Sequence, residues 1–279
     1  MRHIENYGIW KVKVADMVRV AVLGACGKMG RETVKAVTEA PDMCVVGACD
    51  VVCTVSTQAD AIGIQGLDIP IEADFSKMLE ESKPEVVVDF AKPFVIENTK
   101  IAMKLGVIPI IGTTGQTAEE LEEIEKLAQT TGTTAMVIPN FAIGAVLMMK
   151  FAAEAAKYMP DVEIIELHHD RKADAPSGTS IKTAEMIDSA RKAAGVEASV
   201  PAGSLDDPAR GERRNGIHIH SVRLPGLVAH QEVIFGGQGQ ILTIRHDSFD
   251  RTSFMPGVLL AIRHAARTKG FIYGLDKLL

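Results

Sequence analysis

Val20-Ala-Val-Leu-Gly24-Ala-Cys-Gly27-Lys-Met-Gly30 joins a short apolar run to three glycines that recur at every third position. Val18 to Leu23 predicts a strand, and Gly30 to Ala40 predicts the helix that follows it. Glycines at such a turn let the backbone approach a pyrophosphate, whose charge the helix N-terminus attracts. Asp50 ends the next predicted strand about 20 residues after Gly30, the spacing expected for a carboxylate that binds ribose hydroxyls. This context favours a dinucleotide site over an empty strand-to-helix turn.

Short β-branched runs and longer helical stretches alternate after this turn, a pattern typical of parallel strands joined by crossover helices. Further strands are predicted at Cys44 to Cys49, Glu85 to Asp89, Val107 to Ile111 and Ala135 to Ile138, and helices at Val95 to Leu105 and Ala118 to Thr130, the latter capped by Thr117. The nearly all-valine third strand is expected where helices cover both faces of a sheet. The first half of the chain therefore predicts an α/β domain with a parallel sheet.

The pattern changes after Pro139. Helices are predicted at Ala142 to Tyr158, Thr179 to Ala194 and Ser253 to Lys269, and strands at Val162 to His168, Ile217 to Arg223, Gln231 to Phe235 and Gln240 to His246. The last three strands have no helices between them, so the sheet should be antiparallel or mixed. The sequence thus predicts a second, α+β domain.

The length, composition and charge of the chain indicate a globular protein and argue against nucleic-acid and membrane binding. The 279 residues suffice for two domains, and 47% hydrophobic with 24% charged residues is typical of a globular protein. The net charge of −6 gives no broad attraction to nucleic acid or an anionic membrane. The longest apolar stretch, Phe141 to Met149, is too short to span a bilayer. Residues 1–16 lack the apolar run of a secretory signal, so we expect a cytoplasmic protein with a short N-terminal extension.

Cysteine and histidine are the residue types in this sequence that could bind a metal ion. Cys26, Cys44, Cys49 and Cys53 fall in the first fifth of the chain without a C-x-x-C pair, which favours reduced thiols over a disulfide or zinc site. His218 and His220 share one face of a strand, but no third ligand is evident nearby, so we predict no metal site. Arg210-Gly-Glu-Arg-Arg214 is expected to be a solvated loop.

A second chemical motif is Glu166-Leu-His168-His169-Asp170-Arg-Lys172-Ala-Asp174-Ala-Pro176-Ser177-Gly178-Thr179. It places an acid/base group, a cation and an anion-binding helix start within one loop. Such a loop suits a small-molecule substrate that carries carboxylates. The alternative is that His168 and His169 are ordinary surface groups at the end of a strand.

The residues after Asp50 bear on the choice of cofactor. A 2′-phosphate needs a cationic partner, most often an Arg beside the acidic residue, but this chain has Val51 and Val52. NADH is therefore favoured. Lys28 in the glycine loop leaves NADPH use open.

Together these motifs resemble the 4-hydroxy-tetrahydrodipicolinate reductase family, the dihydrodipicolinate reductases of lysine and diaminopimelate synthesis. The resemblance runs from about Met17 to the C-terminus. It is carried by the glycine loop, Val88-Asp89-Phe90, Ile111-Gly-Thr-Thr-Gly115, Pro139-Asn-Phe-Ala-Ile-Gly144 and, most specifically, Glu166 to Thr179. It implies reduction of dihydrodipicolinate to tetrahydrodipicolinate by NAD(P)H. One departure is Val228-Ala-His-Gln-Glu232, where V-G-E-H-E is commoner.

The resemblance also implies domains and residue roles. It implies a Rossmann domain at 17–140 and 251–279, a substrate-binding and oligomerisation domain at 141–250, and a homotetramer. His168 would be the proton donor/acceptor and Lys172 the proton donor. The substrate would contact His169, Lys172, Ser177, Gly178 and Thr179. The cofactor would contact Gly24, Ala25, Cys26, Gly27, Lys28, Met29, Gly30, Asp50, Phe90, Gly112, Thr113, Thr114, Ile138, Pro139, Asn140 and Phe141.

Two other functions fit the same pattern. One is a nicotinamide-dependent dehydrogenase of another amino or imino dicarboxylate, such as an aspartate dehydrogenase. The other is a regulator that senses NADH without catalysis. The intact His168 and Lys172 pair argues against the regulator, because a pure sensor does not need an acid/base loop.

Overall fold

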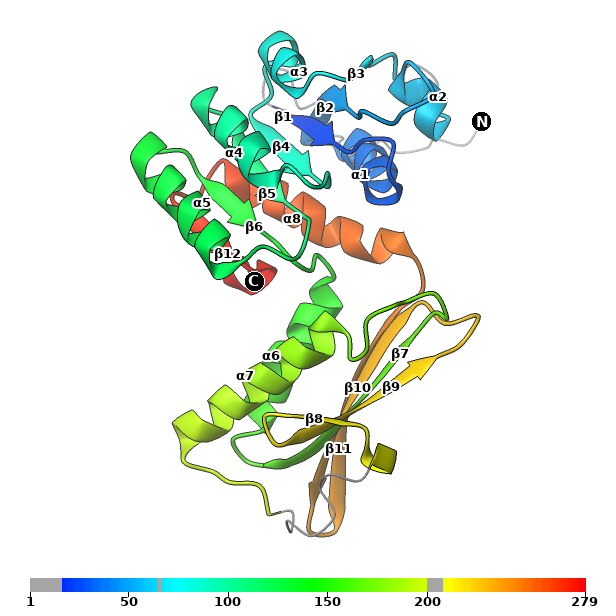
Figure 1. Ribbon diagram of the computed structural model, residues 1–279, viewed down its shortest axis with the longest axis vertical. Helices are drawn as coiled ribbons and strands as arrows, with labels where there is room; N and C mark the ends of the chain where they lie inside the picture. Colours follow the sequence, from blue (N-terminus) through cyan, green and yellow to red (C-terminus); the bar gives the residue numbers. More distant parts are fainter. Residues whose placement is uncertain (1–16, 65–66, 200–207) are drawn as a thin grey trace, which may run out of the picture. The chain divides into compact units, whose positions relative to one another are not determined.

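The computed structural model describes residues 17–64, 67–199 and 208–279, which form two compact units (Figure 1). Unit 1 comprises residues 17–139 and 258–278, and unit 2 comprises residues 140–257. The N-terminal extension predicted at 1–16 lies outside the described residues.

Unit 1 is built on a seven-stranded sheet in the order β12-β6-β5-β4-β1-β2-β3. Its strands are β1 (Val18–Leu23), β2 (Met43–Cys49), β3 (Ile71–Glu72), β4 (Val86–Asp89), β5 (Ile108–Ile111), β6 (Ala135–Val137) and β12 (Phe271–Tyr273). All paired neighbours run parallel. The strand order reverses between β1 and β4, and sheets of this kind bind ligands outside the carboxyl ends of the strands at such a reversal.

Helices enclose this sheet. They are α1 (Lys28–Glu39), α2 (Gln58–Ile62), α3 (Phe75–Ser82), α4 (Val95–Lys104), α5 (Ala118–Thr131) and α8 (Met255–Ala265), which enters unit 1 at Val258. Every residue of β4 is buried, as expected for a strand covered on both faces. The cap predicted at Thr117 is present as a capping box with Glu120. The sequence did not predict α2, α3, β3 and β12, which are short.

Unit 2 contains a five-stranded mixed sheet in the order β11-β10-β7-β9-β8. Its strands are β7 (Asp161–His168), β8 (Glu212–Arg214), β9 (Ile217–Arg223), β10 (Ala229–Gly237) and β11 (Gln240–Ser248). β7 pairs antiparallel with β10 and parallel with β9. The predicted fold class, a parallel α/β domain followed by an α+β domain, is confirmed. The solvated loop predicted at Arg210 to Arg214 is wrong in part, because residues 212–214 pair with β9 as an exposed edge strand.

Two helices, α6 (Ile143–Ala155) and α7 (Gly178–Ala194), pack together beside this sheet (Figure 1). α7 ends at Gly195, which adopts the left-handed conformation that favours glycine. Among the described residues, no helix combines the length and the apolar character needed to cross a bilayer.

The central strand β7 brings a charged side chain into the interior of unit 2. Side chains alternate between the two faces of a strand, so Val162, Ile164 and Glu166 share a face. All three are buried, and Glu166 is 0% exposed. The same periodicity directs His168 to this face.

The expectation that all four cysteines are reduced thiols is wrong, because Cys26 and Cys53 form a disulfide with a Cα–Cα distance of 5.8 Å. Cys44 and Cys49 are free. The two bonded cysteines are separated by 27 residues, so a search for closely spaced pairs could not find them. Because β1 pairs with β2, the glycine loop lies beside the segment after Asp50, and Cys26 and Cys53 come close enough to bond.

Candidate active site

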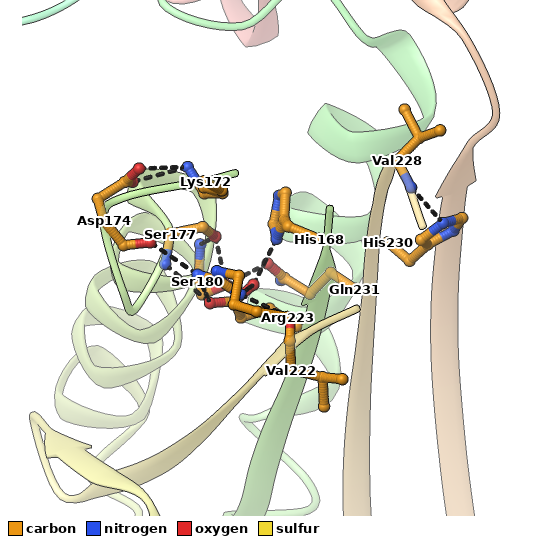
Figure 2. A network of polar contacts seen from close by, with 11 residues as sticks. His168, Lys172, Asp174, Ser177, Ser180, Val222, Arg223, Val228, His230 and Gln231 are labelled. Carbon is orange, nitrogen blue, oxygen red and sulfur yellow. Dashed lines mark hydrogen bonds and ion pairs between the residues drawn. The ribbon is translucent and has the colours of Figure 1, made fainter. Parts of the chain in front are cut away.

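The carboxylate of Glu166 is the centre of a buried polar network in unit 2. Figure 2 labels its partners His168, Ser177 and Arg223. Arg223 donates to it from both terminal nitrogens, with distances of 2.7 and 2.8 Å. The backbone N–H of Ser177 donates to Oε1 at 3.2 Å, and Nδ1 of His168 bonds Oε2. Burial opposes ionisation of Glu166, but its hydrogen bonds to His168, Arg223 and Ser221 outweigh burial and lower its pKa to about 2.

The bond to Glu166 sets the protonation pattern of the His168 ring. An ionised carboxylate only accepts hydrogen bonds, so Nδ1 of His168 must carry the hydrogen. In the neutral ring, Nε2 is then the unprotonated nitrogen, able to accept a proton. The His168 side chain is 15% exposed, against 0% for Glu166. This arrangement suits an acid/base group, because Glu166 holds Nδ1 of the His168 ring in place and Nε2 remains available.

The Lys172 ammonium is bound on its own loop. It contacts both carboxylate oxygens of Asp174 at 2.7 Å. The Asp174 side chain is 61% exposed and that of Lys172 is 20% exposed. The hydrogen bond from Lys172 is the main cause that lowers the pKa of Asp174. Arg223 bonds the backbone carbonyl of Asp174 at 2.7 Å, which ties this loop to the Glu166 network.

The N-terminus of α7 adjoins the same network. Ser177 is 3% exposed, and its hydroxyl accepts from the backbone N–H of Ser180 as the helix N-cap. Gly178 and Thr179 follow in the first turn, where backbone N–H groups have no acceptor within the helix. A Cβ added at Gly178 would meet no atom within 4 Å. A carboxylate therefore fits this helix start both electrostatically and sterically.

Gln231 connects α7 to the sheet by hydrogen bonds. It belongs to the segment Val228 to Glu232, which differs from the commoner family pattern. Its amide oxygen accepts from Ser180 at 2.9 Å, and its amide nitrogen donates to Thr183 at 2.8 Å. Gln231 is 4% exposed. His230, next to it, bonds Asp247 at 2.7 Å. Glutamine at this position thus holds the helix whose N-terminus faces the network (Figure 2).

Within the described residues, no side-chain hydrogen bond joins His169, His218 or His220 to this network. The ring nitrogen Nδ1 of His169 is buried and has no hydrogen-bond partner among the described residues. His218 is 4% exposed, and within the described part of the chain neither of its ring nitrogens has a partner. His220 bonds Glu163 at 2.8 Å. His218 and His220 therefore do not share a ligand-like arrangement.

The residues predicted to contact the cofactor within unit 1 all follow parallel strands. The glycine loop follows β1, Asp50 follows β2, Phe90 follows β4, residues 112–114 follow β5 and residues 138–139 follow β6. These strands are neighbours in the sheet, so the residues lie at its carboxyl edge. Asn140 and Phe141 belong to unit 2, where Asn140 bonds Thr179 at 3.4 Å.

The glycine loop fits a dinucleotide phosphate. Gly24 has a φ of 77°, and a Cβ at Gly30 would lie 2.1 Å from the Gly24 carbonyl oxygen, so both positions require glycine. Gly27 caps α1 without a side-chain hydrogen bond, which leaves the first-turn amides open to an anion. Asp50 accepts from the backbone N–H groups of Cys26 and Val52, both at 2.9 Å. Each carboxylate oxygen accepts two hydrogen bonds, so Asp50 keeps capacity for ribose hydroxyls.

The sequence analysis assigned no role to Glu166 and did not single out Arg223. Glu166 lies two residues before His168 on the same strand, so the period of two already places both on one face. Arg223 gave no such signal, because it is 57 residues from its partner and meets it only through the pairing of β7 with β9.

Two family models cover almost all of the described chain. The model described as dihydrodipicolinate reductase, N-terminus, matches residues 18–141, and the model described as dihydrodipicolinate reductase, C-terminus, matches residues 144–279. The chain belongs to the dihydrodipicolinate reductase family. It is therefore an oxidoreductase with a domain that binds NAD(P)H, and the resemblance carried by its motifs is confirmed.

Individual relatives agree with this family. A 4-hydroxy-tetrahydrodipicolinate reductase of Syntrophomonas wolfei is 53% identical over 94% of this chain and 98% of its own length. One from Listeria welshimeri is 51% identical over 94% of this chain and 100% of its own. A dipicolinate-bound dihydrodipicolinate reductase from Paenisporosarcina sp. TG-14 superposes with a TM-score of 0.81 at 43% identity, covering 94% of this chain and 100% of that one. An amine dehydrogenase from Mycobacterium smegmatis, with a TM-score of 0.65 at 14% identity over 93% and 95% of the two chains, shares the fold alone.

Proposed function

We propose that the chain reduces 4-hydroxy-tetrahydrodipicolinate to tetrahydrodipicolinate, with His168 as the proton donor/acceptor and Lys172 as the proton donor. The observation that supports these roles is the single network that joins the His168 ring, the Lys172 loop and the N-terminus of α7 (Figure 2). An acid/base group, a cation and an anion site in one network match a cyclic imine that carries two carboxylates.

The chemistry requires protonation after reduction. Loss of water leaves a conjugated imine, and addition of hydride at its distal carbon moves electron density toward the ring nitrogen. When bound, the reduced nicotinamide supplies that hydride. Lys172, and His168 once its Nε2 has taken up a proton, offset the developing charge and deliver a proton, contributions that are typically worth about 10²–10⁴-fold each.

Lys172 must leave Asp174 to reach the substrate. Exposed ion pairs contribute only about 0–1 kcal/mol, so this exchange costs little. The amides of Gly178 and Thr179 would hold one substrate carboxylate, and His169 would contact the substrate beside them. The buried Ser177 hydroxyl acts as the helix cap, so its contribution to the substrate is indirect.

For the cofactor we propose NADH as the favoured form, held by the loop from Gly24 to Gly30 and by Asp50. Val51 and Val52 are 78% and 83% exposed, so the positions after Asp50 offer no cation to a 2′-phosphate. Residues 112–114 and 138–141, with Phe90, would contact the nicotinamide half.

We propose a cytoplasmic homotetramer that binds neither nucleic acid nor membrane. The tetramer follows from the family resemblance. It is supported by exposed apolar side chains on the edge strand β11, where Ile241 is 74% exposed and Leu242 is 39% exposed.

Substitution of the two proton-transfer residues tests this assignment. His168→Ala and Lys172→Ala should each lower turnover by about 10²–10⁴-fold while NADH binding, measured by fluorescence titration, stays within about threefold of the parent. Unchanged turnover in both variants would contradict the roles. Loss of NADH binding would instead mean that the substitution disturbs the cofactor site.

A further inference from the structure

Glu166 places a negative charge where packing alone would favour an apolar side chain. Its side chain is 0% exposed, and its oxygens accept from Arg223 twice, from Ser177 and from His168. Buried ion pairs are often no more stabilising than apolar residues of the same size. A carboxylate so fully engaged beside an acid/base group therefore calls for an explanation other than stability.

A second Glu–His–Arg cluster on the same strand offers a comparison. Glu163 bonds His220 and Arg210, but its side chain is 37% exposed and lies on the opposite face of β7. Water reaches this cluster, so its charges need not hold one geometry. The Glu166 carboxylate has no such freedom, because it is 0% exposed and is bonded by Arg223, Ser177 and His168.

Three of the partners of Glu166 each lead to a group with a proposed role. His168 is the proton donor/acceptor, Ser177 caps the helix whose amides face the substrate carboxylate, and Arg223 also holds the carbonyl of Asp174 in the Lys172 loop. One carboxylate thus fixes three groups relative to one another. Precise placement of reacting groups contributes to catalysis because a small displacement costs orders of magnitude in rate.

We infer that Glu166 is a positioning residue, which holds the hydrogen of neutral His168 on Nδ1 so that Nε2 faces the substrate, and which ties this ring to the Lys172 loop through Arg223. The inference rests on the function proposed above. It assigns Glu166 no contact with the substrate and no proton transfer of its own.

Glu166→Gln is the first test, with Glu163→Gln as the matched control. Glutamine keeps the size but can donate as well as accept, so we expect ¹⁵N NMR of labelled histidine to show a mixture of the two neutral His168 tautomers instead of the Nδ1–H form. Turnover should fall by about tenfold or more, with KM for NADH within about twofold of the parent. Glu163→Gln should change neither turnover nor the His168 signals. Parent-like turnover with an unchanged tautomer in Glu166→Gln would overturn the inference.

Glu166→Asp keeps the test valid if Glu166→Gln does not fold. Aspartate retains the charge for Arg223 but is one methylene shorter, so we expect it to fold, lose the His168 contact and show the same mixed tautomer and lower turnover. Full turnover in Glu166→Asp would contradict the inference.

A double-mutant cycle separates positioning from a general structural role. If Glu166 acts through His168, adding Glu166→Asp to His168→Ala should lower turnover by less than about twofold further. Two losses that multiply would mean that Glu166 acts independently of His168. If His168→Ala alone keeps parent turnover, the proposed proton-transfer role of His168 fails; if it loses turnover while both Glu166 variants keep it, only the positioning role fails.

Discussion

The pKa values of two buried carboxylates, Glu166 and Asp89, depend on the groups around them. Glu166 and Asp89 are both almost completely buried, at 0% and 2% exposed. Burial opposes ionisation of Glu166, but hydrogen bonds from His168, Arg223 and Ser221 lower its pKa to about 2. Within the described residues, the side chain of Asp89 accepts from the Ala91 amide at 2.7 Å and from Asn98 at 3.5 Å, and burial raises its pKa to about 7. Two carboxylates in similar burial thus ionise in very different pH ranges because their partners differ.

The raised pKa of Asp89 predicts a pH dependence of stability. Between its ordinary value of 3.8 and about 7, the folded protein keeps a proton that the unfolded chain releases, so stability falls as pH rises through this window. Asp89→Asn removes the titration. The melting temperature of the parent should therefore fall more than that of Asp89→Asn between about pH 5 and pH 8, in scanning calorimetry. Parallel curves for the two proteins would show that Asp89 is not responsible.

Among the structural elements, α7 carries the proposed anion site beside the sheet of unit 2. Gly178 at its start has room for a methyl group and no positive φ, so nothing within the protein requires glycine there. Gly236 in β10 also has room for a Cβ. Alanine should therefore fit within the protein at both positions. A defect found only at Gly178 would then indicate a ligand that occupies the space there.

Gly178→Ala should leave the melting temperature within a few degrees of the parent but raise KM for the dicarboxylate substrate by about tenfold, since roughly 1.4 kcal/mol of lost binding has that effect. The control Gly236→Ala should change neither quantity. Steady-state kinetics and thermal denaturation measure both. An unchanged KM in Gly178→Ala would argue against a carboxylate at this helix N-terminus.

The disulfide between the glycine loop and the segment after β2 predicts a thiol count. Unfolded but unreduced protein should show the two free thiols, Cys44 and Cys49, in a colorimetric titration. Reduction should expose the other pair and lower the free energy of unfolding by about 2–4 kcal/mol. Because disulfides are uncommon in the cytoplasm, the protein should be quenched with acid directly from cells. Four thiols before reduction would contradict the Cys26–Cys53 bond.

Local sequence signals predicted the long elements and missed the contacts between distant segments. The cap at Thr117 and the stop at Gly195 were readable because a helix end depends on adjacent residues. β3 and β12 have two and three residues, too few for a periodic pattern. The pairing of Glu166 with Arg223 depends on which strands are neighbours, which no local pattern specifies. The glycine loop and the His168 motif could be recognised in the sequence. The network of Glu166, Arg223 and Ser177 around His168 could not.

At the scale of the whole molecule, a net charge of −6 must be compatible with the two anionic ligands proposed for this chain. The proposed sites contain positive groups that are concentrated locally. Lys28 opens α1, and Lys172 lies in the loop before α7. The first-turn amides of both helices add partial positive charge. A modestly acidic surface therefore does not prevent anion binding at the two helix starts.

The proposed reaction is the reduction of a cyclic imine dicarboxylate, with NADH as the favoured cofactor. The most direct measurement is the oxidation of NADH, followed by absorbance, with freshly made product of dihydrodipicolinate synthase, and in parallel with oxaloacetate plus ammonia and with NADPH in place of NADH. We predict rapid oxidation with the synthase product, a higher kcat/KM for NADH than for NADPH, and no oxidation with oxaloacetate plus ammonia. Oxidation only with oxaloacetate plus ammonia would indicate an aspartate dehydrogenase, and oxidation with neither would indicate a protein that binds NADH without catalysis; either result would contradict the account.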